Sequence, residues 1–293
     1  YNASQIIFTP VGSISAINVQ LGMAELDSEK ASLSQLIANT GSSLIGHFGG
    51  GATVIRTAQS KLRDVVCVFD YMTQAQINDV KAGTLLLDVS LAILNAIADI
   101  QANGGGILYF PPGKYRISQN LNVNWNASLE RFEPAGKVVL RGAGSSMTAF
   151  MDYRTSVATG ACVNYDFSSS GEAGIDSHIL STWTGGFSII RALNGTVVVN
   201  GEYTSMGTGT GFKANFVWGG VYSDIAVSGF STNLSFIDCV NFSIDKVFTT
   251  KCNIGLYMSK NTYSPAIATS ITNMTASQCK SWGVKSINGS FEI

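Results

Sequence analysis

The amino-acid sequence predicts an all-β-dominated chain in which a parallel β-helix follows a small α-helical N-terminal part. The first observation is a repeat, because three stretches beyond residue 219 can be superimposed: Ser223–Phe236, Ser243–Met258 and Ser270–Val284. Val227, Val247 and Met274 are the predicted equivalent positions, which gives a repeat length in the twenties. Strands repeated at this interval, with polar corners between them, are typical of a solenoid. The LxxLxL pattern of leucine-rich repeats is absent, so a parallel β-helix fits better.

The composition is the second observation, and it agrees with many short strands joined by tight turns. The 293 residues include 31 glycines and only 5 prolines, and 13% of them are charged. A formal net charge of −1 indicates neither nucleic acid nor a membrane surface as a partner. No apolar run is long enough to span a membrane, and no leader peptide is visible. Because the first residue is not Met, we expect the natural start to lie upstream.

The third observation is a helix that leads directly into strands. Asp88 can cap this helix by accepting from its freed backbone N–H groups. Leu91, Leu94 and Ile97 then recur at helical spacing. Asn103 and three glycines end the helix after residue 102. Three segments that favour strands follow, around a Pro-Pro-Gly turn at residues 111–113: Ile107–Phe110, Tyr115–Ile117 and Leu121–Val123. Further on, residues 150–182 are poor in periodicity and are predicted as a long loop or a decorated turn.

Two stretches resemble a known family. The sequence GGGILYFPPGKYRIS, followed by LRGAGSSMTAF at Leu140–Phe150, resembles the entrance of a pectate-lyase-like right-handed parallel β-helix in bacteriophage tailspikes. This resemblance covers residues 88–150 and includes no catalytic residue. Residues 52–83 resemble the neck that precedes tailspike β-helices, although Tyr71 and Met72 stand where many relatives have a Phe-Gly-Ala turn. The positions that match the neck pattern are Arg56, Gln59, Lys61, Leu62, Arg63, Asp64 and Asp70.

A further helix is predicted over residues 17–38. Its apolar residues fall at alternating steps of four and three, which is a heptad pattern with one charged position. An amphipathic surface helix and a self-associating coiled coil both fit, and the second is favoured because no other large apolar partner lies nearby in the sequence. The segment also resembles the regions that join phage tail fibres and depolymerases to the virion. The heptad positions are Val19, Met23, Leu26, Lys30, Leu33 and Ile37.

These observations divide the chain into three parts. We expect a virion-anchoring, coiled-coil segment at residues 1–50 and a neck at residues 51–87. The parallel β-helix is expected at residues 88–293, with its entry helix at residues 88–102. No capping segment follows the last predicted strand, so we expect the β-helix to be incomplete at its C-terminus.

Five cysteines are scattered along the chain without a CxxC pair: Cys67, Cys162, Cys239, Cys252 and Cys279. Such a set predicts buried free thiols in a protein that folds in a reducing cytosol. The two histidines, His47 and His178, are isolated, and we expect neither a metal nor a cofactor. The glycines of Gly207–Gly211 lack the strand–turn–helix context of a phosphate-binding loop.

Candidate chemistry lies in acids near aromatic rings. Glycoside hydrolysis needs a protonated and an ionised carboxyl group, about 5–5.5 Å apart for retention or about 6.5–9.5 Å apart for inversion. Coils about 4.8 Å apart can bring two acids to either separation. At a corner, however, an Asp usually bonds to its own turn. A lyase would instead combine a base with a cation such as Lys213 or Arg191. The candidate catalytic acids are Glu202, Asp224, Asp238 and Asp245, and the candidate sugar-stacking rings are Tyr203, Trp218 and Tyr222.

The resemblance implies a homotrimeric phage tailspike that attaches to a bacterial surface polysaccharide (capsule, O-antigen or exopolysaccharide) and depolymerises it. Such a protein is a virion component of the phage tail, assembled in the host bacterial cytoplasm, with its N-terminal segment bound to other tail proteins. Two alternatives stay open: a non-catalytic, structural or adhesive tail fibre, and a cellular pectate-lyase-like enzyme. The heptad helix and the neck pattern favour a phage protein over the cellular enzyme.

Overall fold

The computed structural model of the chain divides into two compact units, Tyr1–Asp64 and Val65–Ile293. Residues 65–87, expected in the neck, lie in the same unit as the β-helix. The structure describes residues 2–7, 9, 17–29, 46–47, 56–57, 65–124, 138–154, 160–166, 183–192, 198–199, 202–203, 207–215, 217–259, 267–287 and 290–291.

The first unit contains short elements. These are the 3-10 helix η1 (Ala3–Gln5), helix α1 (Val19–Glu29) and the antiparallel strands β1 (Gly46–His47) and β2 (Arg56–Thr57). Helix α1 covers the first part of the predicted heptad helix, and Met23 on the heptad stripe is exposed. The heptad positions Lys30, Leu33 and Ile37 lie outside the described residues, so the coiled coil stays a prediction.

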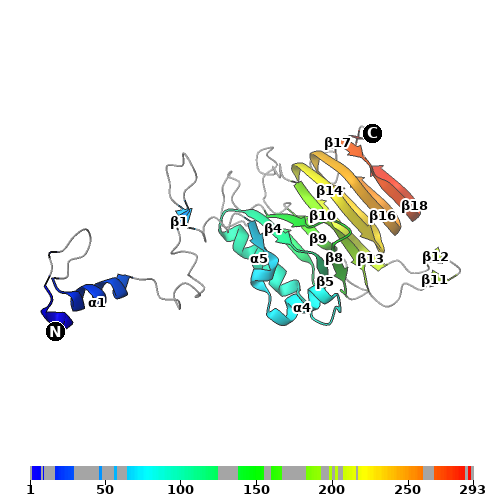
Figure 1. Cartoon of the computed structure of the whole chain (residues 1–293). Helices are drawn as coiled ribbons and strands as arrows, with labels where there is room; N and C mark the ends of the chain where they lie inside the picture. Colours follow the sequence, from blue (N-terminus) through cyan, green and yellow to red (C-terminus); the bar gives the residue numbers. More distant parts are fainter. Residues whose placement is uncertain are drawn as a thin grey trace. The chain divides into compact units, whose positions relative to one another are not determined.

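The second unit begins with a strand and three helical elements that cover one end of the β-helix (Figure 1). They are β3 (Val65–Cys67), the 3-10 helix η3 (Val68–Tyr71), α4 (Gln74–Ala82) and α5 (Ser90–Ala102). Helix α5 is the predicted entry helix, and Asp88 Oδ1 accepts from its first backbone N–H, that of Ser90, at 3.0 Å. Its buried face, which includes Ile93, Ile97 and Ile100, contacts β4 and β6 and so closes the apolar interior of the first coil.

The rest of the unit winds in successive coils that each pass through three faces. Coil 1 consists of β4 (Gly106–Phe110), β5 (Gly113–Ile117) and β6 (Leu121–Asn124), and coil 2 of β7 (Val138–Gly142), β8 (Thr148–Asp152) and β9 (Ala161–Asp166). In later coils, longer strands bend from one face into the next. Coil 3 consists of β10 (Trp183–Arg191) and β13 (Gly207–Asn215), and coil 4 of β14 (Trp218–Ser228) and β15 (Phe230–Ile237). Coil 5 is β16 (Val240–Ser259), coil 6 is β17 (Ile267–Thr272) with β18 (Thr275–Ile287), and β19 (Ser290–Phe291) follows.

Strands of neighbouring coils pair in parallel on all three faces, from β4 with β7 at one end to β16 with β18 at the other. Figure 1 shows the result as one sheet that curls around the core. The predicted fold class, a parallel β-helix behind a small helical part, is therefore confirmed. The prediction of a loop over residues 150–182 was wrong for β9, in which Ala161, Val163 and Tyr165 are buried in strand alternation.

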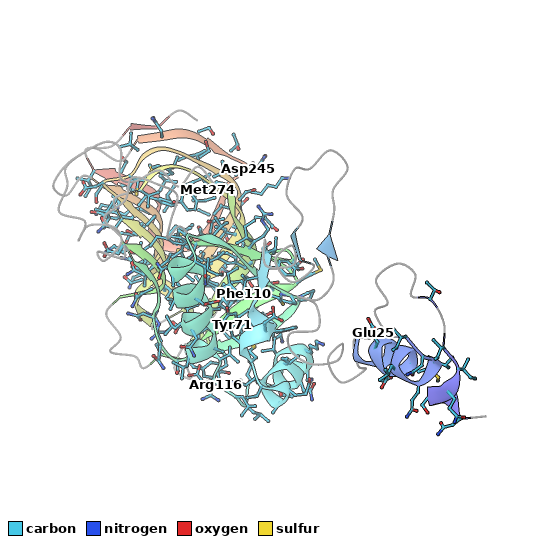
Figure 2. All side chains as sticks on the ribbon, turned by 90° about the vertical axis from the view of Figure 1, so that its left-hand side faces the viewer. Glu25, Tyr71, Phe110, Arg116, Asp245 and Met274 are labelled. Carbon is cyan, nitrogen blue, oxygen red and sulfur yellow. The ribbon has the colours of Figure 1, made fainter. Side chains whose placement is uncertain are left out.

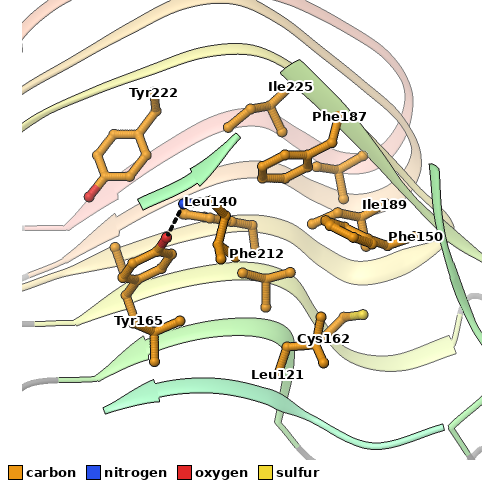
Figure 3. Packing of buried hydrophobic residues seen from close by; sticks show 14 of the residues in the cluster. Leu121, Leu140, Phe150, Cys162, Tyr165, Phe187, Ile189, Phe212, Tyr222 and Ile225 are labelled. Atoms are coloured by element: carbon orange, nitrogen blue, oxygen red, sulfur yellow. Dashed lines mark hydrogen bonds between the residues drawn. The ribbon is translucent and has the colours of Figure 1, made fainter. Parts of the chain in front are cut away.

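Buried aromatic rings fill the interior and link one coil to the next (Figure 3). Phe150 lies between Phe110 and Phe187, with ring centroids 4.8 and 5.1 Å apart. Below the third face, Phe212 contacts Tyr165 at 5.7 Å and Phe236 at 6.1 Å. Each such pair contributes about 0.5–1.5 kcal/mol beyond its buried area. The coils are therefore held in register by side chains as well as by the backbone ladder.

The corners between faces use residues in the left-handed backbone region. At the first corner, between the first and second faces, coils 3 to 6 place Gly186, Asp224, Lys246 and Asn273 at equivalent positions, each with φ between 51° and 74°.

The register of the later coils corrects one of the predicted equivalences. Ile225, and not Val227, pairs with Val247, so the repeat between coils 4 and 5 is slightly longer than predicted. The repeat between coils 5 and 6 agrees with the prediction, because Asp245 pairs with Thr272 and Phe248 pairs with Thr275. This register makes Met274 equivalent to Val247.

Candidate functional site

Two of the predicted acids lie on adjacent coils beside the first corner. Asp245 is the last residue of the first face in coil 5, where it pairs with Ser223 of coil 4. Asp224, the next residue of coil 4, occupies the corner itself with φ 55°. The two acids are thus on adjacent coils, offset by one position instead of being equivalent.

The carboxylate of Asp224 holds a loop that belongs to coil 2. Its Oδ2 accepts from the backbone N–H of Ser145 at 3.0 Å, and its Oδ1 accepts from the Ser145 hydroxyl at 2.5 Å. Ser145 lies between β7 and β8, so the contact passes over coil 3. Gly186 fits beneath this loop because a Cβ atom there would lie 2.6 Å from the Gly142 carbonyl oxygen. Asp224 therefore bonds to another coil's turn, not to its own.

Asp245 receives hydrogen bonds from the coil that follows it. The Thr272 hydroxyl donates to its Oδ1 at 2.9 Å, and the Asn273 side-chain amide donates to the same oxygen at 2.8 Å. These bonds, that from Asn273 first, lower the pKa of Asp245 below its usual value. Figure 2 shows Asp245 near Met274, at the opposite end of the sheet from Tyr71 and the entry helices. The charged form suits a base, a nucleophile or a structural acceptor, and it does not suit a general acid.

Asp238 stands apart from the other two acids. It lies in the turn between β15 and β16, where the chain passes from the third face to the first, and its φ is 51°. It is only 7% exposed, and its backbone N–H donates to the Ser259 carbonyl oxygen at 3.0 Å. The structure does not bring Asp238 to the corner shared by Asp224 and Asp245, because a whole face separates the two turns.

The proposed role of Tyr222 in sugar stacking conflicts with its position. Its side chain points into the core and is 2% exposed, with its ring 4.9 Å from Phe236 and 5.5 Å from Phe212. Burial raises the pKa of Tyr222 above its usual value. A ring enclosed by other rings offers no face to a ligand, so this assignment is corrected.

The remaining predicted residues are placed by their backbone alone. Trp218 is the first residue of β14 and pairs with Val240. Glu202 and Tyr203 form β12 (Glu202–Tyr203), which pairs antiparallel with β11 (Val198–Val199). This hairpin is inserted in coil 3 between the second and third faces. The side chains of these three residues lie outside the described part of the structure.

Arg191, considered as a charge neutraliser for a lyase, is committed to a buried ion cluster. Asp152 is 0% exposed and binds Arg191 Nη1 and Arg154 Nε, each at 2.8 Å. Arg154 also donates to Asn120 Oδ1 at 2.5 Å, so the cluster joins coils 1, 2 and 3. Lys213 is different, since it lies on the outer surface of the third face with its Nζ 3.8 Å from Asp166 Oδ2.

Sequence reasoning missed a line of side chains on the third face, which alternate with the core residues and of which one, Ser235, is only 4% exposed. Register pairs join its members one coil at a time, and five steps of about 4.8 Å give a length of about 24 Å. We call this line the polar row. Its members are Asn122, Asn164, Lys213, Ser235, Tyr257 and Lys285.

Contacts along and beside the polar row support its side chains. Asn164 donates to Asn122 Oδ1 at 3.2 Å, and the Lys285 Nζ lies 6.0 Å from the centre of the Tyr257 ring. Asp166, in the neighbouring line, accepts from Asn215 at 3.0 Å. The row offers amides, ammonium groups and one aromatic ring. Its signal in the sequence is a polar or aromatic residue between two inward residues of each strand, and aligning the strands would have found it.

Two kinds of site are not found in the described part of the chain. No group of three or more His, Cys, Asp or Glu side chains there is arranged to hold a metal ion. No helix among the described residues is long and apolar enough to cross a membrane. All five cysteines are thiols outside any disulfide, with Cys162, Cys239 and Cys252 buried and the other two half-buried.

Comparison with known proteins gives structural neighbours only. No family model and no curated protein matches the sequence. The structure is similar to ORF18 of Geobacillus virus E2, with 16% identity and a TM-score of 0.48 over 80% of this chain and 45% of that chain. It is similar to tailspike protein 3 of bacteriophage CBA120, with 14% identity and a TM-score of 0.46 over 87% of this chain and 38% of that chain. A third neighbour is the catalytic unit of the GH87 α-1,3-glucanase from Streptomyces thermodiastaticus strain HF3-3, with 16% identity and a TM-score of 0.44 over 78% of this chain and 35% of that chain. The chain thus spans less than half the length of each of these three.

Proposed function

We propose that the chain is part of a phage tailspike that attaches to a bacterial surface polysaccharide along the polar row and depolymerises it. The entrance and neck motifs in the sequence support the tailspike assignment, together with the parallel β-helix behind an entry helix. The polar row is the observation that carries the attachment. It gives a repeating ligand a line of contacts on every coil except coil 4, whose member Ser235 is buried.

The chemistry of the polar row fits a sugar chain. The half-buried amides of Asn122 and Asn164 supply polar groups of the kind that bind sugar hydroxyls, although Asn164 Oδ1 is itself buried. The half-buried Tyr257 offers an apolar ring face with a polar tip, on which a sugar ring can stack. Lys213 and Lys285 add two positive charges, and Asp166 offsets one of them. The row therefore suits a polysaccharide with acidic groups better than a neutral one.

Depolymerisation is assigned to Asp224 and Asp245, because they lie on adjacent coils at one corner. Asp238 and Glu202 are further candidates from the sequence, and for a lyase mechanism Lys213 is the candidate cation. One observation favours attachment without cleavage as a second function. Oxygens of both Asp224 and Asp245 already accept hydrogen bonds from Ser145, Thr272 and Asn273.

The N-terminal segment completes the proposal. A heptad stripe that begins in α1 supports self-association into a homotrimer, and the same segment would attach the spike to other tail proteins in the virion. Light scattering tests this step directly. We expect a mass three times that of one chain, and a monomer would contradict the trimer while leaving attachment through the polar row open to test.

The decisive experiment measures binding and cleavage of purified bacterial capsules, O-antigens and exopolysaccharides by one protein preparation. Immobilised polysaccharide reports binding, new reducing ends report cleavage, and ultraviolet absorbance from new unsaturated sugar ends separates a lyase from a hydrolase. We expect Tyr257→Ala and Lys285→Ala each to weaken binding at least about tenfold, the loss of roughly 1.4 kcal/mol. Lys114→Ala is the matched control, because Lys114 is an exposed lysine on the second face. Equal binding by all three variants would overturn the polar row as the site, and binding without new reducing ends would favour the adhesive function.

A further inference from the structure

Two cysteines face each other across the last two coils. Cys252 in β16 and Cys279 in β18 are register partners in the parallel ladder, although they are distant in the sequence. Their Sγ atoms are 2.9 Å apart. The Cys239 thiol instead contacts the carbonyl oxygens of Ala214 and Ile237.

The register of the two strands at this pair suits a disulfide. Register partners in neighbouring parallel strands are about 4.8 Å apart, within the range of about 4.4–6.8 Å between the Cα atoms of a disulfide. The sulfur atoms need to approach by less than about 1 Å to reach the bond length of about 2.05 Å. Gly255 leaves room beside them, since a Cβ atom there would lie 3.3 Å from Cys279 Sγ.

The two thiols differ in their access to a reagent. Cys252 is 0% exposed, and burial raises the pKa of its thiol above the usual value. Cys279 is half-buried. A dissolved oxidant therefore meets Cys279 first, and Cys252 is placed to react only with its neighbour.

We propose that Cys252 and Cys279 are a dithiol that a small-molecule disulfide such as oxidised glutathione converts into an intramolecular disulfide, which ties coil 6 to coil 5. The Cys279 thiolate attacks the reagent, forms a mixed disulfide and releases one glutathione thiol. The Cys252 thiolate then attacks Cys279 Sγ and releases the second. The protein loses two electrons and two protons, and the reagent is reduced to two thiols.

The consequence is a stronger attachment of coil 6 to coil 5. The disulfide closes the loop between Cys252 and Cys279, which removes conformational freedom from the state in which β18 is detached. Proteolysis of the chain that requires this state should therefore slow by roughly a hundredfold after oxidation. The reaction needs neither the polar row nor the corner acids. It can therefore succeed or fail independently of the proposed attachment to polysaccharide.

The test treats the whole chain with oxidised glutathione, then denatures it and counts thiols with a chromogenic disulfide. We expect the count to fall from five to three, and non-reducing peptide mapping to show one linked peptide that contains both residues. Five remaining thiols, a lasting glutathione adduct on Cys279 or a disulfide between two chains would each overturn the proposal.

Two single variants test the order of the steps. Cys252→Ser should accumulate the glutathione adduct on Cys279, because the resolving thiol is absent. Cys279→Ser should leave Cys252 unmodified, because a buried thiol does not meet the reagent. Cys239→Ser is the matched control and should still form the linked peptide. If a variant does not fold, peptide mapping of the unaltered chain decides the question alone.

Discussion

Asp224 and Ser145 lie far apart in the sequence, yet the two oxygens of the Asp224 carboxylate bind the backbone N–H and the hydroxyl of Ser145. The contact joins coil 4 to a loop of coil 2 across the glycine corner of coil 3. It explains two features at once, namely the run of small residues in the loop and an aspartate at a left-handed corner. Asp224 therefore has a structural role in addition to the catalytic role proposed for it.

We predict that Asp224→Ala lowers the free energy of unfolding by about 1–3 kcal/mol, because it leaves two donors of a half-buried loop without an acceptor. Urea unfolding measures the change, and Ser145→Ala serves as the partner in a double-mutant cycle. Strong coupling between the two changes is expected. Additive effects would show that the contact does not stabilise the fold, and loss of cleavage with unchanged stability would mark Asp224 as catalytic instead.

We predict that Asp245 makes the stability of the fold depend on pH. Because hydrogen bonds from Asn273 and Thr272 lower the pKa of its carboxyl in the folded state, the charged form stabilises the fold. This contribution is fully present above the pKa of the unfolded state, about 3.9, and disappears as the pH falls through the lower folded pKa. The difference in urea midpoint between the unaltered chain and Asp245→Ala should therefore be constant near neutral pH and vanish in strong acid. A difference that persists in acid would mean that the substitution acts through something other than the charge.

We predict that a substitution of the corner residue Lys246 stabilises the fold. It is exposed and has φ 52°, a backbone region in which most side chains are unfavourable by about 1–2 kcal/mol. Asn tolerates this region better, and the coil that follows uses Asn273 at the equivalent position. Lys246→Asn should therefore raise the free energy of unfolding by about 0.5–1 kcal/mol, since an exposed charge beside Asp245 contributes little. Lys114→Asn, in an extended strand, is the control and should be neutral or slightly destabilising. Equal effects of the two changes would refute the explanation.

The fold was predictable because its signals are local. The entry helix was expected at residues 88–102 and spans Ser90–Ala102, since its cap, spacing and terminal glycines all lie within or beside it. The faces of the later strands follow from simple alternation. The predicted equivalence of Val227 and Val247 was wrong because several corner types are possible, and the sequence alone does not show which residue takes the left-handed conformation.

The candidate site was less predictable because its members meet only through register. Asn164 and Lys213 of the polar row are neighbours across coils, yet they are far apart in the sequence. Loops of different lengths separate the strands, so no fixed repeat leads from one member to the next. Tyr222 shows the converse error. A tyrosine ring was expected to stack against a sugar, but the position of Tyr222 in the alternation of β14 directs its ring into the core.

The buried cluster of Asp152, Arg154 and Arg191 gives the strongest prediction. Both arginine side chains are 2% exposed, and Asp152 is the acid that binds each of them at 2.8 Å. Asp152→Ala leaves two buried positive charges without this partner and should destabilise the fold by about 3–5 kcal/mol. Asp166→Ala is the matched control, because its pair with Lys213 is 28% exposed on both sides and 3.8 Å long, and such a surface pair is worth about 0–1 kcal/mol. The loss of stability, measured by thermal and urea unfolding, should therefore be several times larger for Asp152→Ala than for Asp166→Ala. Similar small changes in both would mean that water reaches the arginines of the cluster, and that the joint between coils 1, 2 and 3 rests on the aromatic core instead.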